Sequence, residues 1–153
     1  MKKYLLIPAL IMSLNLSAIE NTNTLITPKT GEFVWNELAT NNLQAAKDFY
    51  SKMFGWEFVD KKMDDLTYTI IKKGDKEFGG IWAIPEAQQN QIPPHWLTYI
   101  LVENIEKSLE IASQNGATIL KPVQTAGEMG LFAIIKDPAG AHLALWQPLK
   151  NNE

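Results

Sequence analysis

Glu37, Tyr99 and His142 have side chains that could carry acid–base chemistry: a carboxylate, a phenol and an imidazole. Each of them falls within a predicted strand. A carboxylate, a phenol and an imidazole brought to one surface could accept and donate protons. Glu37 and His142 are therefore the candidate catalytic residues. If Glu37 is buried beside Trp35, desolvation would raise its pKa and make it a possible base. The alternatives are a structural carboxylate that bridges strands and a solvated histidine at a strand entrance.

Aromatic residues share the faces of these predicted strands. Alternation places Trp35 with Glu37, Leu97 with Tyr99, and both His142 and Trp146 with Ala144. The facing of two further rings, at positions 68 and 82, is open. The predicted ligand-binding set is Trp35, Glu37, Tyr68, Trp82, Leu97, Tyr99, His142 and Trp146. Such a surface suits a planar or apolar small molecule held by stacking and a few hydrogen bonds, unless the rings are only core.

Composition excludes several other chemistries. The 153 residues include no cysteine, so thiolate catalysis, disulfides and Cys-type zinc sites are impossible. There is no G-x-S-x-G elbow and no glycine-rich phosphate motif; Gly79 and Gly80 lie in a predicted strand, where they favour close backbone approach. All basic side chains are lysines and the net charge is −3, so nucleic acid is not an expected partner.

A repeated order of elements must position these residues. A strand over 31–38, a helix from the Asn42 cap to Gly55, and strands over 56–61, 66–73 and 77–84 form a first unit. The same order recurs over 95–149, with a helix from the Asn104 cap to Gly116, at an offset of 62 residues. The prediction is an α+β fold: two βαβββ modules, 31–84 and 95–149, whose curved mixed sheets surround a cavity with the helices outside. The proline-containing stretch 85–94 is the linker.

The first residues predict export. Lys2 and Lys3, an apolar run over 4–14 and Ala18 have the layout of a secretory signal peptide cleaved after residue 18. A membrane anchor is the alternative, but the run is short of the ~20 residues that span a bilayer. Residues 19–30 are interpreted as a leader and 150–153 as a tail. We expect a secreted or periplasmic protein that is not bound to membrane after cleavage.

Four stretches resemble the vicinal oxygen chelate superfamily, which includes glyoxalases, bleomycin-resistance proteins and extradiol dioxygenases. They are "WNELATNNLQAAKDFYSKMFGWEF", "GGI", "WLTYILVENIEKSLEIASQNGA" and "DPAGAHLALWQP". The resemblance implies a cup-shaped cavity and, in many members, a divalent metal at its floor. The corresponding ligand positions hold Trp35, Leu97, Gly80 or Ile81, and Ala144, none of which can coordinate a cation. The family's metal chemistry is therefore not expected, and no metal or other cofactor is predicted.

Three functions remain open from the sequence. The first is a metal-free protein that binds a small molecule. The second is a glyoxalase-like lyase or isomerase, or a dioxygenase-like oxidoreductase, with an atypical site. His95 and His142, the only histidines, could belong to an atypical metal site, although two ligands without a third rarely hold zinc. The third is an interaction module whose cavity is filled by its own side chains.

The resemblance also implies a homodimer. Two modules can close a cavity within one chain, or each can pair with a module of a second copy. The semi-stiff linker with Pro85, Pro93 and Pro94 favours the second arrangement. We therefore expect Trp35 and Glu37 of one copy to face Tyr99 and His142 of another.

Overall fold

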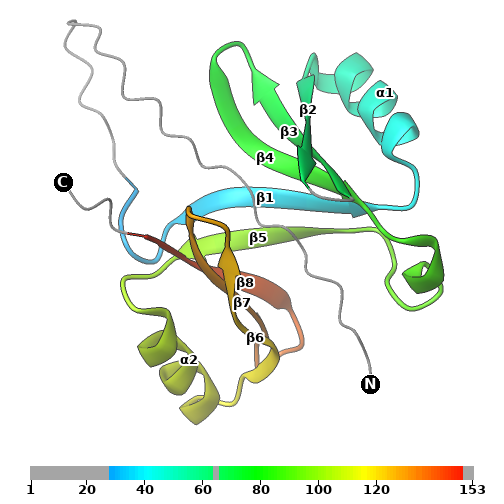
Figure 1. The fold of residues 1–153 in the computed structure, drawn as a ribbon. Coiled ribbons are helices and arrows are strands. Elements are labelled where there is room, and N and C mark those ends of the chain that lie inside the picture. Colours follow the sequence, from blue (N-terminus) through cyan, green and yellow to red (C-terminus); the bar gives the residue numbers. More distant parts are fainter. Residues whose placement is uncertain (1–27, 64–65, 150–153) are drawn as a thin grey trace, which may run out of the picture.

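Two βαβββ modules succeed one another along the chain in the computed structural model, which describes residues 28–63 and 66–149 (Figure 1). The predicted signal peptide, the leader up to residue 27 and the tail lie outside the described residues. The first module comprises β1 (Phe33–Thr40), α1 (Leu43–Phe54), β2 (Glu57–Met63), β3 (Leu66–Lys73) and β4 (Lys76–Ala83). The second comprises β5 (His95–Leu101), α2 (Ile105–Gln114), β6 (Thr118–Ala126), β7 (Gly130–Lys136) and β8 (His142–Pro148). The linker contains a short 3-10 helix, η1 (Glu86–Gln88).

The asparagine caps start both helices as predicted. The side chain of Asn42 accepts a hydrogen bond from the amide of Ala45, and that of Asn104 accepts one from the amide of Lys107, each at 2.9 Å. These bonds satisfy amides that the first turn leaves without partners. Gly55 ends α1 in the left-handed conformation with a φ of 65°. The second helix ends slightly earlier than Gly116, which has a φ of 86° and follows the Asn115 cap.

One mixed sheet of eight strands runs through both modules, in the order β2-β3-β4-β1-β5-β8-β7-β6. Within each module the first and last strands are parallel neighbours, β1 with β4 and β5 with β8. The antiparallel pair β1 and β5 joins the modules at the middle of the sheet (Figure 1). The α+β class and the two modules are confirmed, and the modules share a continuous sheet that does not close.

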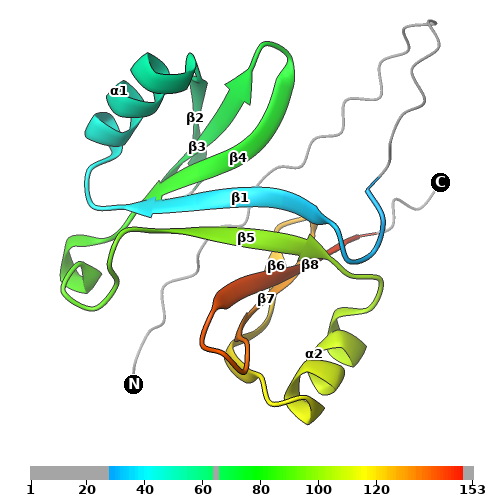
Figure 2. The same ribbon diagram turned by 180° about the vertical axis from the view of Figure 1, so that it is seen from behind.

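The helices cover the outer face of this sheet. Figure 2 shows α1 and α2 at opposite ends of the molecule, each beside the strands of its own module. Leu38, Ile71 and Ile81 pack beneath α1, whereas Ile105 and Leu109 of α2 pack on Leu145 and its neighbours. Neither helix in the described ranges is long and apolar enough to cross a bilayer.

The opposite face, here called the inner face, carries one large cluster drawn from both modules. The cluster contains Trp35, Ala39, Tyr68, Ile70, Trp82, Ile84, Leu97, Tyr99, Ala126, Phe132, Ala144 and Trp146. The predicted alternation is therefore confirmed: Trp35 and Trp146 share this face, and so do the two rings at positions 68 and 82 whose facing the sequence leaves open.

Candidate functional site

A buried carboxyl group on the central strand is the polar centre of the inner face. Glu37 of β1 is paired with Gly80 of β4 on one side and with Leu97 of β5 on the other. Only 1% of the residue is exposed. This position places the carboxyl group at the junction of the two modules, where each can supply a partner.

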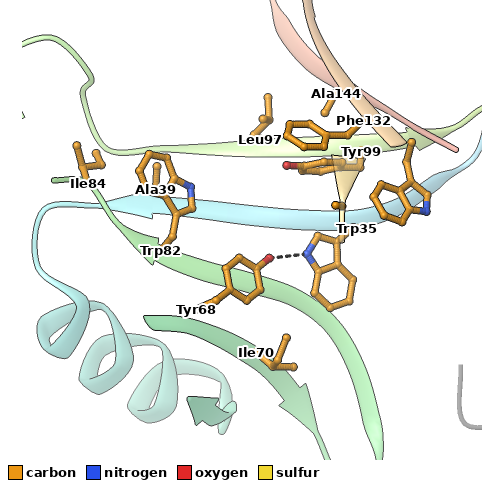
Figure 3. Close-up of a cluster of buried hydrophobic side chains, with 12 residues drawn as sticks. Trp35, Ala39, Tyr68, Ile70, Trp82, Ile84, Leu97, Tyr99, Phe132 and Ala144 are labelled. Carbon is orange, nitrogen blue, oxygen red and sulfur yellow. Dashed lines mark hydrogen bonds between the residues drawn. The ribbon is translucent and has the colours of Figure 1, made fainter. Parts of the chain in front are cut away.

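Three ring side chains form a directed hydrogen-bond network that ends on this carboxyl group. Trp35 Nε1 donates to Tyr68 Oη at 3.0 Å, and Tyr68 Oη donates to Glu37 Oε2 at 2.9 Å. Tyr99 Oη donates to Glu37 Oε1 at 3.2 Å. Figure 3 shows Tyr68 and the Trp35 indole on one side of the β1 ribbon, and Tyr99 with Leu97 on the other side of it. Both carboxyl oxygens thus accept a phenol hydrogen, one from each module.

A glycine makes room for one of these phenols. A Cβ at Gly80 would overlap the hydroxyl of Tyr68, and a Cβ at Gly79 would lie 2.6 Å from the carbonyl oxygen of Asn36. The predicted close approach of backbone is confirmed at Gly79, whereas at Gly80 the close neighbour is the Tyr68 side chain. Gly80 is one of the two positions matched to a family metal ligand on β4; Ile81, the other, packs on the outer face. The Tyr68 phenol fills the space beside Gly80.

Burial controls the charge of Glu37. Desolvation raises its pKa from 4.5 to about 7, although the phenols of Tyr68 and Tyr99 and the positive charge of Lys121 oppose the rise. Burial and the nearby carboxylate also raise the pKa of Tyr68 and of Tyr99 well above 10, so both phenols remain donors. Lys121, half-buried on β6 with Nζ 5.6 Å from the Phe132 ring centre, has its pKa lowered by burial. Glu37 therefore changes charge near neutral pH.

A small cavity of about 90 Å³ opens beside this carboxyl group. Its wall is formed by Glu37, Trp82, Ile92, His95, Leu97, Ile134 and His142. An engineered apolar cavity of about 150 Å³ binds benzene, so this one admits a smaller group or part of a larger molecule. The wall combines one acid, two imidazoles and apolar or aromatic surface, a composition typical of small-molecule sites.

The two histidines meet at this cavity. His95 is half-buried and His142 is exposed. The Nδ1 of His95 lies 2.8 Å from the carbonyl oxygen of Pro93. A carbonyl can only accept, so Nδ1 donates, and Nε2 is left as the acceptor when the imidazole is neutral.

The structure divides the predicted ligand-binding set into two groups of four. Glu37, Trp82, Leu97 and His142 line the cavity. The other members pack in the inner-face cluster: Trp35, Tyr68, Tyr99 and Trp146. Tyr68 and Tyr99 are not in the cavity wall, but both donate hydrogen bonds to Glu37, which is. Contact of the four with a ligand stays a prediction.

Some lining residues carry no signal that reveals them in the sequence. Ile92 comes from the aperiodic linker, and its place on the inner face depends on how that linker folds. Ile134 alternates correctly on β7, but its nearness to the site requires the pairing of β7 with β8. Lys121 acts on Glu37 from the far edge strand β6.

The residues present do not fit the divalent metal that the fold family implies. In the described residues no group of three or more histidine, aspartate or glutamate side chains is placed to hold a metal ion. Leu97 and Ala144 occupy two of the family's ligand positions and have no donor atoms.

The expectation that the first module faces a second copy at this site is wrong. Strands β1 and β5 pair within one chain, and Glu37 bonds Tyr99 of the same chain. The antiparallel pair of β1 and β5, here called the seam, forms inside the chain because the linker reverses the chain direction between β4 and β5. The arrangement concerns this site alone and leaves the expected homodimer a prediction.

A family profile decides the relationship. The profile of the Glyoxalase/Bleomycin resistance protein/Dioxygenase superfamily matches residues 32–145, which cover all but the ends of the two modules. The chain belongs to this superfamily. The predicted resemblance is thereby confirmed at the level of the superfamily.

The curated relatives that match this chain are longer than it is. The protein named "Putative glyoxylase CFP32" of Mycobacterium tuberculosis is 30% identical over 115 residues, covering 74% of this chain and 44% of its own length. Anthracycline biosynthesis protein DnrV of Streptomyces peucetius is 25% identical over 130 residues, covering 76% of this chain and 47% of its own. The chain thus spans about half the length of the curated relatives it matches.

Solved structures of other proteins share the fold of this chain. The hypothetical protein BH1468 from Bacillus halodurans aligns with a TM-score of 0.60 at 15% identity, covering 82% of this chain and 99% of that one. Methylmalonyl-CoA epimerase from Mycobacterium tuberculosis aligns with a TM-score of 0.58 at 13% identity, covering 82% and 95%. At these identities the likeness shows the fold alone.

Proposed function

We propose that this superfamily member binds a small organic molecule at the inner-face cavity without a metal ion. The observation that carries the proposal is the buried Glu37 carboxyl in the wall of a cavity that is otherwise largely apolar and aromatic. Burying a carboxyl group costs free energy, and each hydrogen bond that it accepts offsets part of that cost. A ligand that donates a further hydrogen bond to Glu37 therefore gains binding energy. Glu37 thus selects for a ligand with a hydrogen-bond donor.

The size of the cavity limits what enters it. A volume of about 90 Å³ holds only a few non-hydrogen atoms, so the polar end of a ligand seats against Glu37. The remainder extends past His95 and His142. Trp82, whose ring is buried in the wall, offers a stacking surface for a planar group.

A second candidate is an enzyme of the glyoxalase-like lyase or isomerase class that moves a proton through Glu37. The observation that favours it is the pKa of about 7, which suits a general base at neutral pH. The name of CFP32 agrees with this class. A dioxygenase-like oxidoreductase gains no support, because the described residues do not provide the donor set of a metal site.

Thermal-shift screening of small donors such as amines, amides and phenols tests the binding proposal. A binder specific for the native state raises the melting temperature of the wild-type protein. Leu97→Trp, whose larger side chain would fill the cavity, and Glu37→Gln should each abolish the shift in melting temperature. Glu103→Gln, at an exposed position, should keep the shift. Binding that survives both site variants, or stoichiometric metal in the purified protein, would overturn the proposal.

Solvent deuterium exchange separates the two candidates. For each binder found, the enzyme proposal expects exchange at a carbon-bound hydrogen, catalysed by wild-type protein and lost in Glu37→Gln. NMR in D₂O measures it. Binding without exchange favours the metal-free binding protein alone.

A further inference from the structure

An uncovered group of aromatic side chains lies on the outer face, away from the cavity. Phe49, Tyr50 and Phe54 of α1, Trp56 after the helix, Phe78 of β4 and Trp96 of β5 form a connected cluster, here called the outer aromatic cluster. Its neighbouring ring centres are 5.1–6.2 Å apart. Trp96 Nε1 donates to Tyr50 Oη at 3.1 Å, which ties the second module's first strand to the first module's helix. The rings are therefore held in place before any partner arrives.

Much of this cluster faces solvent. Phe49 is 57% exposed, Phe54 46% and Trp96 41%, and Met53 beside them is 61% exposed. None of the residues of α1 is buried, whereas α2 buries Ile105 and Leu109. Apolar patches of this kind on a soluble protein mark interaction sites.

The second module is an internal control for what the fold itself requires. Counted from the capping asparagines Asn42 and Asn104, Phe49 corresponds to Ile111, Tyr50 to Ala112 and Met53 to Asn115. The second module forms the same βαβββ unit without aromatic residues at these positions. Tyr50, Trp56 and Phe78 pack against the core beneath α1 and so help to hold the helix on the sheet. The exposed Phe49, Met53, Phe54 and Trp96 lie outside that packed set, and this leaves them available to contact another molecule.

We propose that the outer aromatic cluster is the interface through which this chain associates with a second copy of itself. The charges around it favour that partner. Asp48 and Lys52 of α1 carry opposite signs, and Lys72 lies 3.7 Å from Glu57. A rim with both signs can pair with itself across a two-fold axis, whereas a strongly acidic or basic partner gains little from it.

The exposed area matches the requirement of a dimer. With about 200 Å² for each large side chain, Phe49, Met53, Phe54 and Trp96 expose about 400 Å². Two copies together offer about 800 Å² of apolar surface. A stable interface buries at least about 1,200 Å² in total, of which about 65% is apolar. The cluster therefore supplies the apolar part of a small stable interface.

Sedimentation and light scattering of the protein, purified with the N-terminus that the cell leaves on it, test the interface. Wild-type protein should have twice the chain mass at micromolar concentration. Phe49→Lys and Met53→Lys should each weaken the dimer at least ten-fold, because an ammonium group would be buried among the rings. Ile111→Lys, at the matched and 50% exposed position of α2, should leave the dimer unchanged. Circular dichroism and melting temperature check that all variants fold.

Three results would overturn the inference. One is a monomeric wild-type protein at every accessible concentration, including a monomer that instead sediments with vesicles of phosphatidylglycerol and phosphatidylcholine. Another is a dimer that neither Phe49→Lys nor Met53→Lys weakens. The third is equal weakening by Phe49→Lys and Ile111→Lys, which would reveal a general effect of added charge.

Discussion

Burying the carboxyl group of Glu37 costs solvation that two phenol hydrogen bonds restore only in part. The raised pKa expresses this balance, because the protonated form loses less on leaving water. Tyr68 comes from the first module and Tyr99 from the second, so the charge of one residue depends on both. The ionisation of Glu37 therefore depends on its burial and on side chains from both modules.

Titration of Glu37 predicts a pH dependence of stability. The folded state holds this proton up to about pH 7, whereas the unfolded chain releases it near 4.5, so stability falls as pH rises through this window. The expected loss is roughly 3 kcal/mol between pH 4.5 and pH 8. Urea denaturation at several pH values measures it. In Glu37→Gln this component should vanish, and a variant with the wild-type slope would contradict the assignment; exposed Glu103→Gln is the control.

Gly80 should tolerate no side chain. A Cβ there overlaps the Tyr68 hydroxyl, so Gly80→Ala should lower the free energy of unfolding by about 3 kcal/mol. In a Tyr68→Ala background the space is open, and the same change should cost less than about 1 kcal/mol. Denaturation of the four proteins gives the coupling. Equal cost in both backgrounds would show that the backbone, and not the phenol, is the obstacle.

Strand alternation alone suffices to place Glu37, Trp35, Tyr99 and Trp146 on one face of the sheet. It does not reveal which of the aromatic side chains line the cavity and which pack in the core. That division depends on small residues that leave room for the rings, such as Gly80 beside the Tyr68 hydroxyl, and on the register between strands. The sequence therefore predicts the face and its central acid, but not the shape of the cavity.

At the scale of elements, the two helices are formed alike but packed differently. Both begin at an asparagine cap that the sequence predicts. The second buries Ile105 and Leu109, whereas the first lays only half-buried residues on the sheet. Amphipathic spacing cannot distinguish these cases, because it describes a helix without the layer beneath it.

Alanine substitutions at the matched first helical positions should expose this difference. Ile105 is 1% exposed, so Ile105→Ala should lower the free energy of unfolding by about 2–4 kcal/mol. Leu43 is half-buried, and Leu43→Ala should cost about 1 kcal/mol, because less apolar surface leaves contact. Chemical denaturation of monomeric protein compares the two. A larger loss at Leu43 would mean that α1 is covered more fully than the structure shows.

For the whole molecule, the repeat offset of 62 residues predicts both modules and their order, and the structure confirms both. The join between them is beyond prediction from the repeat, since an intrachain pair of β1 and β5 and a pair between two copies satisfy the same pattern. The length and geometry of the linker decide that choice.

Export is a whole-chain prediction. Lys2, Lys3, the apolar run and Ala18 lead us to expect a mature N-terminus at Ile19. Intact-mass spectrometry of protein from the cells that make it measures the N-terminus directly. A mature protein that still carries residues 1–18 would contradict cleavage, and Ala18→Arg should block processing in the same assay.

The seam between β1 and β5 sets an order of events during folding. It pairs Ala39 with His95 and Phe33 with Ile100, residues more than fifty positions apart, so a long loop must close before it forms. Glu37 can meet Tyr68 within its own module early, but it meets Tyr99 only when the seam closes. At pH 6 the refolding chain therefore takes up a proton as its halves dock. An indicator dye in weak buffer would time that docking from the proton alone.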